Sequence, residues 1–321
     1  MAEERLSEKI KKRSWYETYR PKTIDEITLP EWQMKKFRDY AENPQKCPNL
    51  IFVGPSGSGK TTMAQILIQK WIKSPEDLMI LNGAGIGIDD IRPDAKDASK
   101  GKIYRFAAKT PEKSPFNIVY LEELQNARVQ DFYKFFRQAV EVLSEKTIFI
   151  VSTNSIAELD QPFVKRFNVY NFNSLPVDYT KQYLHDVLSA ENVQFTKEDL
   201  EALVKYYYPS VRDMIQIAQQ YTIDNILQLD HEVIGLNSRI ISLILNLLNT
   251  RNINSPEFEE LVSVCKNNAH LIDINYISKN LVYQVDSITK LKLSKYTAAM
   301  TSRLVPDIAV LALVGEILID N

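Results

Sequence analysis

The sequence predicts an α/β fold in which a parallel sheet is followed by two helical domains. In the first half of the chain, short apolar runs without polar alternation are separated by stretches of helical spacing, and such runs indicate strands buried on both faces. A glycine-rich segment directly follows the first run, and helical spacing dominates after Pro176. We therefore expect three domains, over residues 1–172, 173–232 and 233–321.

Three longer runs and two shorter ones are the candidate strands. The longer runs are residues 50–53, 117–121 and 147–152, and the shorter ones are residues 79–81 and 169–172. The lengths between these runs suit crossover helices, which is the pattern of a parallel sheet covered by helices.

Three helices are expected after the sheet, over residues 179–190, 197–207 and 211–227, with Ser210 as the N-cap of the third. A second helical block runs from near residue 234 to the C-terminus and contains an apolar stripe at helical spacing. The stripe is either the core of a helical bundle or a face that packs on partner subunits. It is formed by Ile240, Leu243, Ile244, Leu247 and Leu248.

Composition excludes several classes of protein. With 39 Lys and Arg against 41 Asp and Glu, the net charge of −2 excludes a protein that is basic overall, so any contact with nucleic acid must be local. Hydrophobic residues make up 45% of the chain, which is enough to build cores and excludes a wholly disordered chain. The longest apolar runs fall far short of the ~20 residues of a membrane-spanning helix. The charged N-terminus has no apolar secretory core.

The cysteines and histidines indicate no metal centre. Cys47 and Cys265 are too few for a disulfide framework or a four-thiolate zinc site, and a reducing, cytoplasmic location is expected. The three histidines are scattered without the spacing of metal ligands, and no Ser/His/Asp or Cys/His arrangement stands out.

Residues 54–61 read Gly-Pro-Ser-Gly-Ser-Gly-Lys-Thr and fit the phosphate-loop pattern G-x-x-x-x-G-K-[ST]. The segment lies between a predicted strand and an amphipathic helix, which disfavours a Gly/Ser turn that matches by chance. Backbone N–H groups and the helix N-terminus converge on phosphates, Lys60 adds a positive charge, and the Thr61 hydroxyl ligates Mg²⁺. The loop residues expected to bind the nucleotide are Gly54, Gly57, Ser58, Gly59, Lys60, Thr61 and Thr62.

Two acids follow the predicted strand 117–121. Phosphoryl transfer needs one acid for the metal and one to orient water, and we assign Glu122 to Mg²⁺ and Glu123 to the water. The more usual order is Asp-Glu. Because Glu122 is one methylene longer than Asp, looser metal geometry and slower turnover are expected. The alternative is a pair of solvated acids at the start of a helix.

Five segments resemble the ATPase subunits of sliding-clamp loaders, which are AAA+ proteins. They are Tyr19-Arg20-Pro21, Asn82-Gly83-Ala84 with the Gly-Ile-Asp-Asp-Ile-Arg that follows, Thr153-Asn154, Pro162-Phe163-Val164-Lys165-Arg166 and Tyr208-Pro209-Ser210-Val211-Arg212. The compact length and the absence of a four-cysteine module favour the large subunits of tailed-phage loaders. The resemblance implies an AAA+ P-loop domain with a parallel sheet, a small helical lid domain and a C-terminal all-helical collar domain for oligomerisation.

The resemblance also implies roles for individual residues at the nucleotide. Asn154 would contact the γ-phosphate or the attacking water, and Arg212 would reach the γ-phosphate from the lid. The ordinary alternatives are a turn-closing Asn and an unpaired surface Arg, and for Tyr19 a ring packed under the sheet. The residues that the resemblance assigns to the adenine side are Tyr16, Glu17, Thr18, Tyr19, Arg20, Ile27 and Thr28.

Two arginines are implied to act across a subunit interface. Arg166 stands where the family reads Ser-Arg-Cys, so it would enter the neighbouring subunit's site as an arginine finger. Lys165 and Phe167 replace the Ser and the Cys of that pattern. Arg137 matches a second interfacial arginine, and a solvated helix face is its alternative.

A basic stretch is the expected contact with DNA. Arg92, Lys96 and Lys100 are spaced so that one helix face carries all three, and in loaders this region follows the backbone of primer-template DNA. A solvated charge run is the alternative. Further implied partners are a sliding clamp, copies of this chain, a distinct smaller loader subunit and, through the clamp, a DNA polymerase; no membrane is implied.

The predicted function is therefore an ATPase, stimulated by DNA and clamp, that opens a sliding clamp and loads it onto primer-template DNA during replication. ATP and Mg²⁺ are its expected cofactors, and the host cytoplasm its location if a phage encodes it. Three alternatives remain: another AAA+ replication ATPase such as a helicase loader, an assembly subunit that binds nucleotide but hydrolyses it poorly, and a phosphate-loop protein outside the AAA+ class.

Overall fold

The structure is a computed structural model of the chain that describes residues 14–27, 29–92, 101–127, 132–172, 175–229, 231–250 and 254–269, and seven single residues beyond them (272, 277, 281, 310, 311, 314 and 315). The chain divides into two compact units, Met1–Leu227 and Gln228–Asn321. The finer division into domains over 1–172, 173–232 and 233–321 stays a prediction.

A five-stranded parallel sheet forms the centre of the first unit. Its strands are β1 (Leu50–Val53), β2 (Leu78–Asn82), β3 (Asn117–Glu122), β4 (Thr147–Thr153) and β5 (Asn168–Asn171), in the order β2-β3-β4-β1-β5. Every neighbouring pair is parallel. The predicted α/β fold with a parallel sheet is confirmed, and each predicted strand lies within one residue of its observed bounds.

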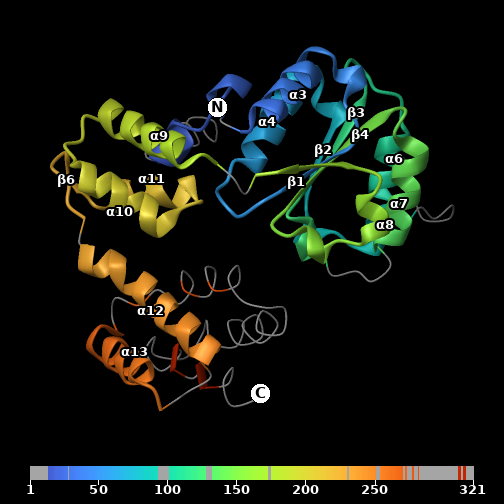
Figure 1. Ribbon diagram of the computed structural model, residues 1–321. Helices are drawn as coiled ribbons and strands as arrows, with labels where there is room; N and C mark the ends of the chain where they lie inside the picture. Colours follow the sequence, from blue (N-terminus) through green and yellow to red (C-terminus); the bar gives the residue numbers. More distant parts are fainter. Residues whose placement is uncertain are drawn as a thin grey trace, which may run out of the picture. The chain divides into compact units, whose positions relative to one another are not determined.

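Helices cover both faces of this sheet (Figure 1). On one face lie α3 (Glu31–Glu42) and α4 (Lys60–Trp71), and on the other α6 (Lys102–Ala108), α7 (Phe132–Leu143) and α8 (Gln161–Val164). Successive strand residues point to opposite faces, so one strand supplies both cores.

Strand β1 illustrates this division. Leu50 and Phe52 pack in the core beneath α3 and α4, whereas Ile51 packs with α7. All three side chains are fully buried. This explains why the run has no polar alternation: a strand with helices on both faces needs apolar residues at every position.

The remaining short elements of the first unit connect these layers. Two are single-turn helices, α2 (Trp15–Thr18) and α5 (Ile88–Ile91). The others are 3₁₀ turns: η1 (Ile24–Glu26), η2 (Pro44–Lys46), η3 (Pro75–Asp77), η4 (Gly83–Gly85), η5 (Leu124–Asn126) and η6 (Ile156–Glu158).

Three helices follow the sheet, α9 (Val177–Ala190), α10 (Lys197–Tyr207) and α11 (Val211–Gln220). The Ser210 hydroxyl caps α11 by accepting from the N–H of Asp213, as the sequence predicts. The prediction that this helix continues to residue 227 is wrong. A small antiparallel hairpin, β6 (Thr222–Ile223) with β7 (Ile226–Leu227), follows instead. Its two turn residues have φ of 51° and 60°, the left-handed conformation that Asp and Asn adopt in tight hairpins.

In the second unit the described residues include two helices, α12 (His231–Thr250) and α13 (Pro256–Asn267). Ile240, Ile244 and Leu247 of the apolar stripe are fully buried and pack with Leu261 and Cys265 of α13. This part of the stripe is therefore the core of the unit itself. No helix among the described residues is long and apolar enough to cross a membrane.

A buried carboxylate ties the start of β2 to the loop before β3. Asp77 is fully buried and accepts hydrogen bonds from the backbone N–H groups of Glu112 (2.7 Å), Lys113 (3.0 Å) and Ser114 (2.9 Å). Burial alone would raise the pKa of Asp77, but these donors outweigh it and hold the pKa well below its usual range. The ionised form is therefore the one that the fold stabilises.

We expect Asp77→Asn to lower the free energy of unfolding by about 2–4 kcal/mol, because an amide cannot accept from three converging N–H groups. Denaturant unfolding at pH 7 measures this loss. Asp25→Asn is the matched control, since Asp25 is exposed and paired with Arg38, and a change below about 1 kcal/mol is expected there.

The pH dependence follows from the lowered pKa. The folded state holds Asp77 ionised more tightly than the unfolded state does, so its contribution is complete above the unfolded pKa of about 4. It is lost as the pH falls from there through the lower folded pKa. The difference between wild type and Asp77→Asn should be constant from pH 7 to 5 and shrink below pH 4; a difference that grows on acidification would contradict this assignment.

Candidate functional site

The phosphate loop joins β1 to α4 in the conformation that a phosphate requires. Gly57 and Gly59 have φ of +76° and +95°, values that other residues rarely adopt. Helix α4 begins after Gly59, and no side chain caps its first turn. The N-terminal N–H groups of this buried, 12-residue helix therefore face the loop, where an anion is favoured.

Lys60 is buried and held by three oxygens at the loop. Its Nζ donates to the carbonyl oxygens of Gly54 (2.7 Å) and Pro55 (2.8 Å) and to Oδ1 of Asn154 (3.0 Å). Asn154 lies just after β4, so the loop lysine and the predicted sensor amide meet at the carboxyl ends of neighbouring strands. The sequence predicts these two residues separately, and the structure brings them together.

A pocket of about 900 Å³, including its open mouth, extends from this loop. One end is formed by the phosphate loop with Glu123, Ser152 and Asn154. The other end is lined by aromatic and apolar side chains, which suit a planar base. These are Tyr16, Pro21, Ile27, Leu175, Tyr179, Tyr183, Val211 and Ile215.

The N-terminal segment and helices α9 and α11 close the second end together. The hydroxyl of Tyr179 in α9 donates to the carbonyl of Glu26 (2.6 Å), and the Tyr183 hydroxyl donates to the carbonyl of Tyr19. In the other direction, the Tyr19 hydroxyl donates to Glu191 (2.8 Å). Burial and this carboxylate raise the pKa of Tyr19 to about 12, so the phenol keeps its proton at neutral pH.

The two acids after β3 have different surroundings. Glu122 is the last residue of the strand and half-buried, whereas Glu123 is exposed, lines the pocket and adopts φ 50° and ψ 49°. Left-handed backbone is costly for a residue with a side chain and aims the carboxylate differently from its neighbour. The backbone N–H of Glu123 donates to Oγ of Ser152 (3.2 Å).

Gly83 is required beside Glu123. A Cβ at position 83 would lie 2.3 Å from the carbonyl oxygen of Glu123 and 3.0 Å from Cα of Leu124, both backbone atoms. A side chain there would push the loop that carries Glu123 out of place. This close packing explains the glycine in the Asn82-Gly83-Ala84 segment, one of the segments that resemble clamp-loader subunits.

Tyr120 connects Thr61 with the loop that carries Glu123. Its buried hydroxyl lies 3.5 Å from Oγ1 of Thr61 and 3.3 Å from Oγ of Ser152. Burial is the main cause that raises the pKa of Tyr120 to about 12, so it stays neutral. The sequence signal for this role is weak, because a tyrosine within a buried strand looks like any other core residue.

Three buried polar atoms around the pocket have no hydrogen-bond partner: Oγ of Ser58, Nε of Arg20 and Nε of Arg212. A buried group without a partner costs free energy unless a ligand satisfies it. Two of the three are guanidinium donors and the third is a hydroxyl of the phosphate loop, so the donor set fits a nucleoside polyphosphate. Among the described residues no group of three or more His, Cys, Asp or Glu could hold a metal ion by itself. Mg²⁺ carried by a nucleotide needs only one or two protein ligands. Of the two predicted ligands, Thr61 lines the pocket at the start of α4, whereas Glu122 ends β3 outside the lining.

Several predicted residues lie apart from this pocket. The Tyr19 side chain does not line the pocket and is bonded to Glu191 at the end of α9. Glu17 pairs with Arg20 (2.7 Å) and does not line the pocket either. Thr18 and Gly54 are also outside the lining, although the Gly54 carbonyl holds Lys60. Thr28 lies outside the described residues.

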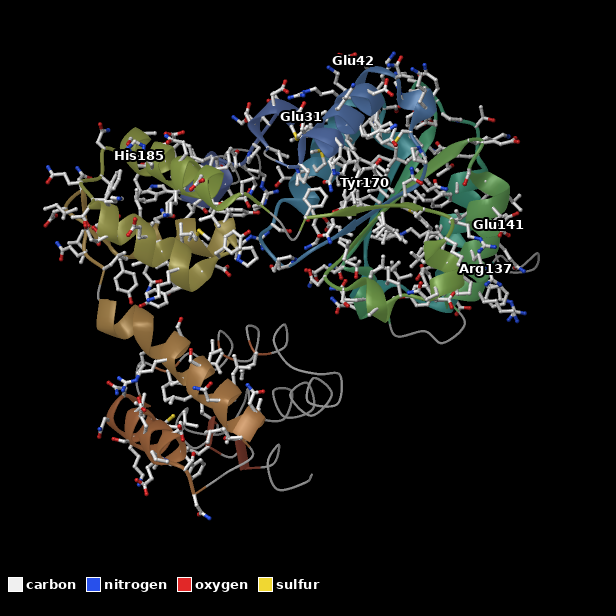
Figure 2. All side chains as sticks on the ribbon, viewed as in Figure 1. Glu31, Glu42, Arg137, Glu141, Tyr170 and His185 are labelled. Carbon is white, nitrogen blue, oxygen red and sulfur yellow. The ribbon has the colours of Figure 1, made fainter. Side chains whose placement is uncertain are left out.

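The two predicted interface arginines lie at α7 and α8. Arg166 follows α8 and pairs with Glu141 of α7, with 2.7 Å from Nε to Oε1. Arg137 and Glu141 come from the same helix one turn apart (Figure 2). Neither arginine lines the nucleotide pocket of its own chain.

The predicted DNA contact is described only at its first residue. Arg92 is exposed, and its guanidinium lies 5.4 Å from the centre of the Phe135 ring. Helix α5 ends at Ile91, with the Asp90 carboxylate accepting from the N–H of Gly87 (2.8 Å). Lys96 and Lys100 lie outside the described residues, so the common helix face stays a prediction.

Comparison with known proteins identifies the sheet domain. Residues 50–175 match the family model "ATPase family associated with various cellular activities (AAA)". These residues form an AAA domain. The predictions of an AAA+ fold and of an ATPase domain that takes ATP with Mg²⁺ are confirmed at this level.

The chain is also similar to curated proteins named as replication factor C small subunits. The replication factor C small subunit of Archaeoglobus fulgidus is 31% identical over 196 residues, 59% of this chain and 58% of that protein. Replication factor C small subunit 2 of Pyrobaculum islandicum is 29% identical over 211 residues, 64% of this chain and 62% of that protein. The chain thus spans between 58% and 62% of the length of these relatives. The resemblance to clamp-loader AAA+ subunits is confirmed, whereas the nearness to tailed-phage large subunits stays a prediction.

A solved structure supports the fold alone. The RuvB Holliday junction branch migration motor of Thermotoga maritima aligns with a TM-score of 0.52 over 90% of each chain, at 15% identity. At this identity the likeness carries no argument about what the AAA domain acts on.

Proposed function

We propose that the chain is an ATP-driven clamp-loader subunit that uses nucleotide binding between subunits to open a sliding clamp and leave it on primer-template DNA. One observation carries the proposal: a phosphate loop, a sensor amide and a lid arginine converge on a single pocket in a chain whose relatives are replication factor C small subunits. ATP can drive such work only if it favours one arrangement of subunits over another.

The residues of the pocket support distinct roles in the hydrolysis. Lys60 and the N-terminus of α4 would hold the phosphates, and Thr61 with Glu122 would hold Mg²⁺, which supplies charge neutralisation when bound. Glu123 would accept a hydrogen bond from the attacking water and orient it. Asn154 already contacts the Lys60 ammonium at 3.0 Å, so it is close enough to sense the terminal phosphate.

The exposed contacts of Arg166 support a role for this residue at the nucleotide of a neighbouring subunit. Its side chain is 32% exposed and its partner Glu141 46% exposed, and ion pairs of this kind are worth about 0.2–1 kcal/mol. The guanidinium also donates to the carbonyl of Pro162 in an exposed hydrogen bond. Redirecting it to a phosphate on another protomer therefore breaks only surface contacts and costs little. The proposed partners are a sliding clamp, primer-template DNA reached by Arg92, Lys96 and Lys100, further copies of this chain and a distinct smaller subunit.

Steady-state ATP hydrolysis tests the proposal. We expect slow hydrolysis by the chain with its partner subunit and strong stimulation when primed DNA and sliding clamp are both present. Stimulation by DNA without any effect of the clamp would favour another AAA+ replication ATPase. Tight ATP binding without turnover under all conditions would favour an assembly subunit that hydrolyses poorly.

We expect Glu123→Gln to reduce turnover by about 10²–10⁴-fold while ATP still binds, because the amide cannot act as a base toward water. The amide oxygen can still accept from Nδ2 of Asn126, now 3.1 Å from the carboxylate, so the loop should keep its shape. Single-turnover hydrolysis and equilibrium binding of a fluorescent ATP separate the two effects. Glu145→Gln, at an exposed position after α7, should leave both unchanged. Wild-type turnover in Glu123→Gln would remove Glu123 from the mechanism.

A further inference from the structure

The ring of Tyr16 lies between two guanidinium groups at the pocket. The centre of the ring is 4.9 Å from Cζ of Arg20 and 4.6 Å from Cζ of Arg212. Both arginines also donate to the Tyr16 hydroxyl, Arg212 at 2.8 Å. Tyr16 and Arg20 belong to the N-terminal segment, whereas Arg212 belongs to lid helix α11, so one phenol joins two separate elements.

The two arginines differ in how their charge is balanced. Arg20 pairs with Glu17 (2.7 Å) and donates to Oε1 of Gln65 (3.0 Å). Arg212 forms no ion pair with a carboxylate within the described part of the chain, and its guanidinium donates to the Tyr16 hydroxyl. Its Nε is buried without a partner. A neutral phenol orients this charge but does not neutralise it, so the site favours an anion.

Holding Arg212 in place has a consequence for binding. A free arginine side chain has about 2 kcal/mol of rotamer entropy to lose when a ligand fixes it. Contact with the Tyr16 ring and hydroxyl fixes the guanidinium before any ligand arrives, which lowers that cost. The lid arginine is then already positioned when the polyphosphate enters, as preorganised charge should be.

We infer that Tyr16 is a positioning residue for Arg212, and that the preference of the pocket for a nucleoside triphosphate over a diphosphate depends on this contact. The inference rests on the proposed function, since it assumes that Arg212 meets the terminal phosphate. A purely structural Tyr16 would instead tie the N-terminal segment to the lid. Loss of such a Tyr16 would lower the affinity for both nucleotides equally.

The ratio of two affinities separates these roles. Fluorescent ADP and a fluorescent, non-hydrolysable ATP analogue are titrated into the full chain with Mg²⁺. We expect Tyr16→Leu to lower the ratio of ATP-analogue to ADP affinity about 10-fold, because it removes both the ring contact and the hydroxyl. Tyr16→Phe keeps the ring and should lower the ratio about 3-fold. Thermal melting without nucleotide reports whether each variant folds. If Tyr16→Leu does not fold, the affinity ratio of Tyr16→Phe is the deciding measurement.

A double variant shows whether Tyr16 acts through Arg212. If it does, Tyr16→Leu combined with Arg212→Ala should have the same affinity ratio as Arg212→Ala alone. Gln219→Leu is the matched control, since it removes the acceptor that joins the backbone N–H of Trp15 in the same N-terminal segment to α11 (3.0 Å) without touching Arg212. Its ratio should stay near that of the wild type.

The outcomes are distinct. A ratio in Tyr16→Leu or Tyr16→Phe within twofold of the wild type, or a double variant well below Arg212→Ala, overturns the role of Tyr16. A wild-type chain that binds neither nucleotide overturns the proposed function instead. A Gln219→Leu variant that loses the ratio as strongly as Tyr16→Phe shows that the contact between the N-terminal segment and α11 as a whole, and not Tyr16, sets the preference.

Discussion

Lys60→Ala is expected to weaken binding of both ATP and ADP by ~100-fold or more, because each charge-assisted hydrogen bond to a phosphate contributes about 1.5–3 kcal/mol and the lysine reaches two phosphates. In the structure its ammonium is buried and bound by two carbonyl oxygens of the loop and by Oδ1 of Asn154. Weaker binding of both nucleotides distinguishes this variant from Arg212→Ala, in which only the affinity for ATP should fall.

The measurement is equilibrium binding of fluorescent nucleotides together with the nucleotide-induced rise in melting temperature. Lys70→Ala is the matched control: it removes a lysine from the same helix at an exposed position and should bind as the wild type does. Since the N–H groups of the loop remain, weak residual binding is compatible with the assignment. Affinity within threefold of the wild type in Lys60→Ala would remove residues 54–61 from the nucleotide site.

The sheet could be predicted from the sequence because its physics is local. The inner strands β1, β3 and β4 are covered by helices on both faces and need mostly apolar residues, so each is visible as a run without polar alternation. The edge strands β2 and β5 are more exposed and are visible only as shorter runs. The hairpin after α11 could not be predicted, because the spacing of its apolar residues also fits a helix. The apolar residues at 223, 226 and 227 keep helical spacing, although α11 ends at Gln220 and the left-handed conformation at Asp224 and Asn225 turns the chain into a hairpin.

The phosphate end of the site could also be predicted from the sequence, because a loop that binds phosphates needs glycines, a lysine and a threonine at fixed spacing. At the aromatic end, Tyr16, Arg20 and Ile27 are expected from the family resemblance and line the pocket, but the other lining residues have no sequence signal. Tyr179, Tyr183 and Ile215 come from lid helices, far along the chain from Tyr16 and Ile27, and a tyrosine on an amphipathic helix carries no sign of what it will face. The sequence placed Tyr19 at the adenine, but its hydroxyl is used by Glu191.

Contacts between separate elements explain the remaining gaps. The pairing of Arg166 with Glu141 joins two residues 25 positions apart, and the packing of Gly83 against Glu123 joins the ends of two neighbouring strands. Neither follows from spacing along one helix or strand. Both depend on the order of strands in the sheet, which apolar runs alone do not fix.

Arg166→Ala is expected to leave ATP binding intact and to lower turnover in the assembled complex by about 10³–10⁵-fold, the effect of an arginine finger in other phosphoryl-transfer enzymes. The guanidinium does not line the pocket of its own chain, so its removal leaves every nucleotide contact described here in place. Arg38→Ala is the control, since Arg38 is likewise a surface arginine paired with a carboxylate, Asp25 at 2.8 Å. It should turn over normally.

Mixing two inactive variants tests whether the finger acts in trans. Lys60→Ala cannot bind ATP but still carries Arg166, whereas Arg166→Ala binds ATP but lacks the finger. In randomly mixed assemblies, about one interface in four pairs an intact loop with an intact finger from the neighbour, so activity should reappear although each variant alone is inactive. If Arg166 served its own nucleotide, no mixture could contain a complete site. A mixed assembly that is shown to hold both chains and yet stays inactive would therefore contradict the proposed arrangement of the site between subunits.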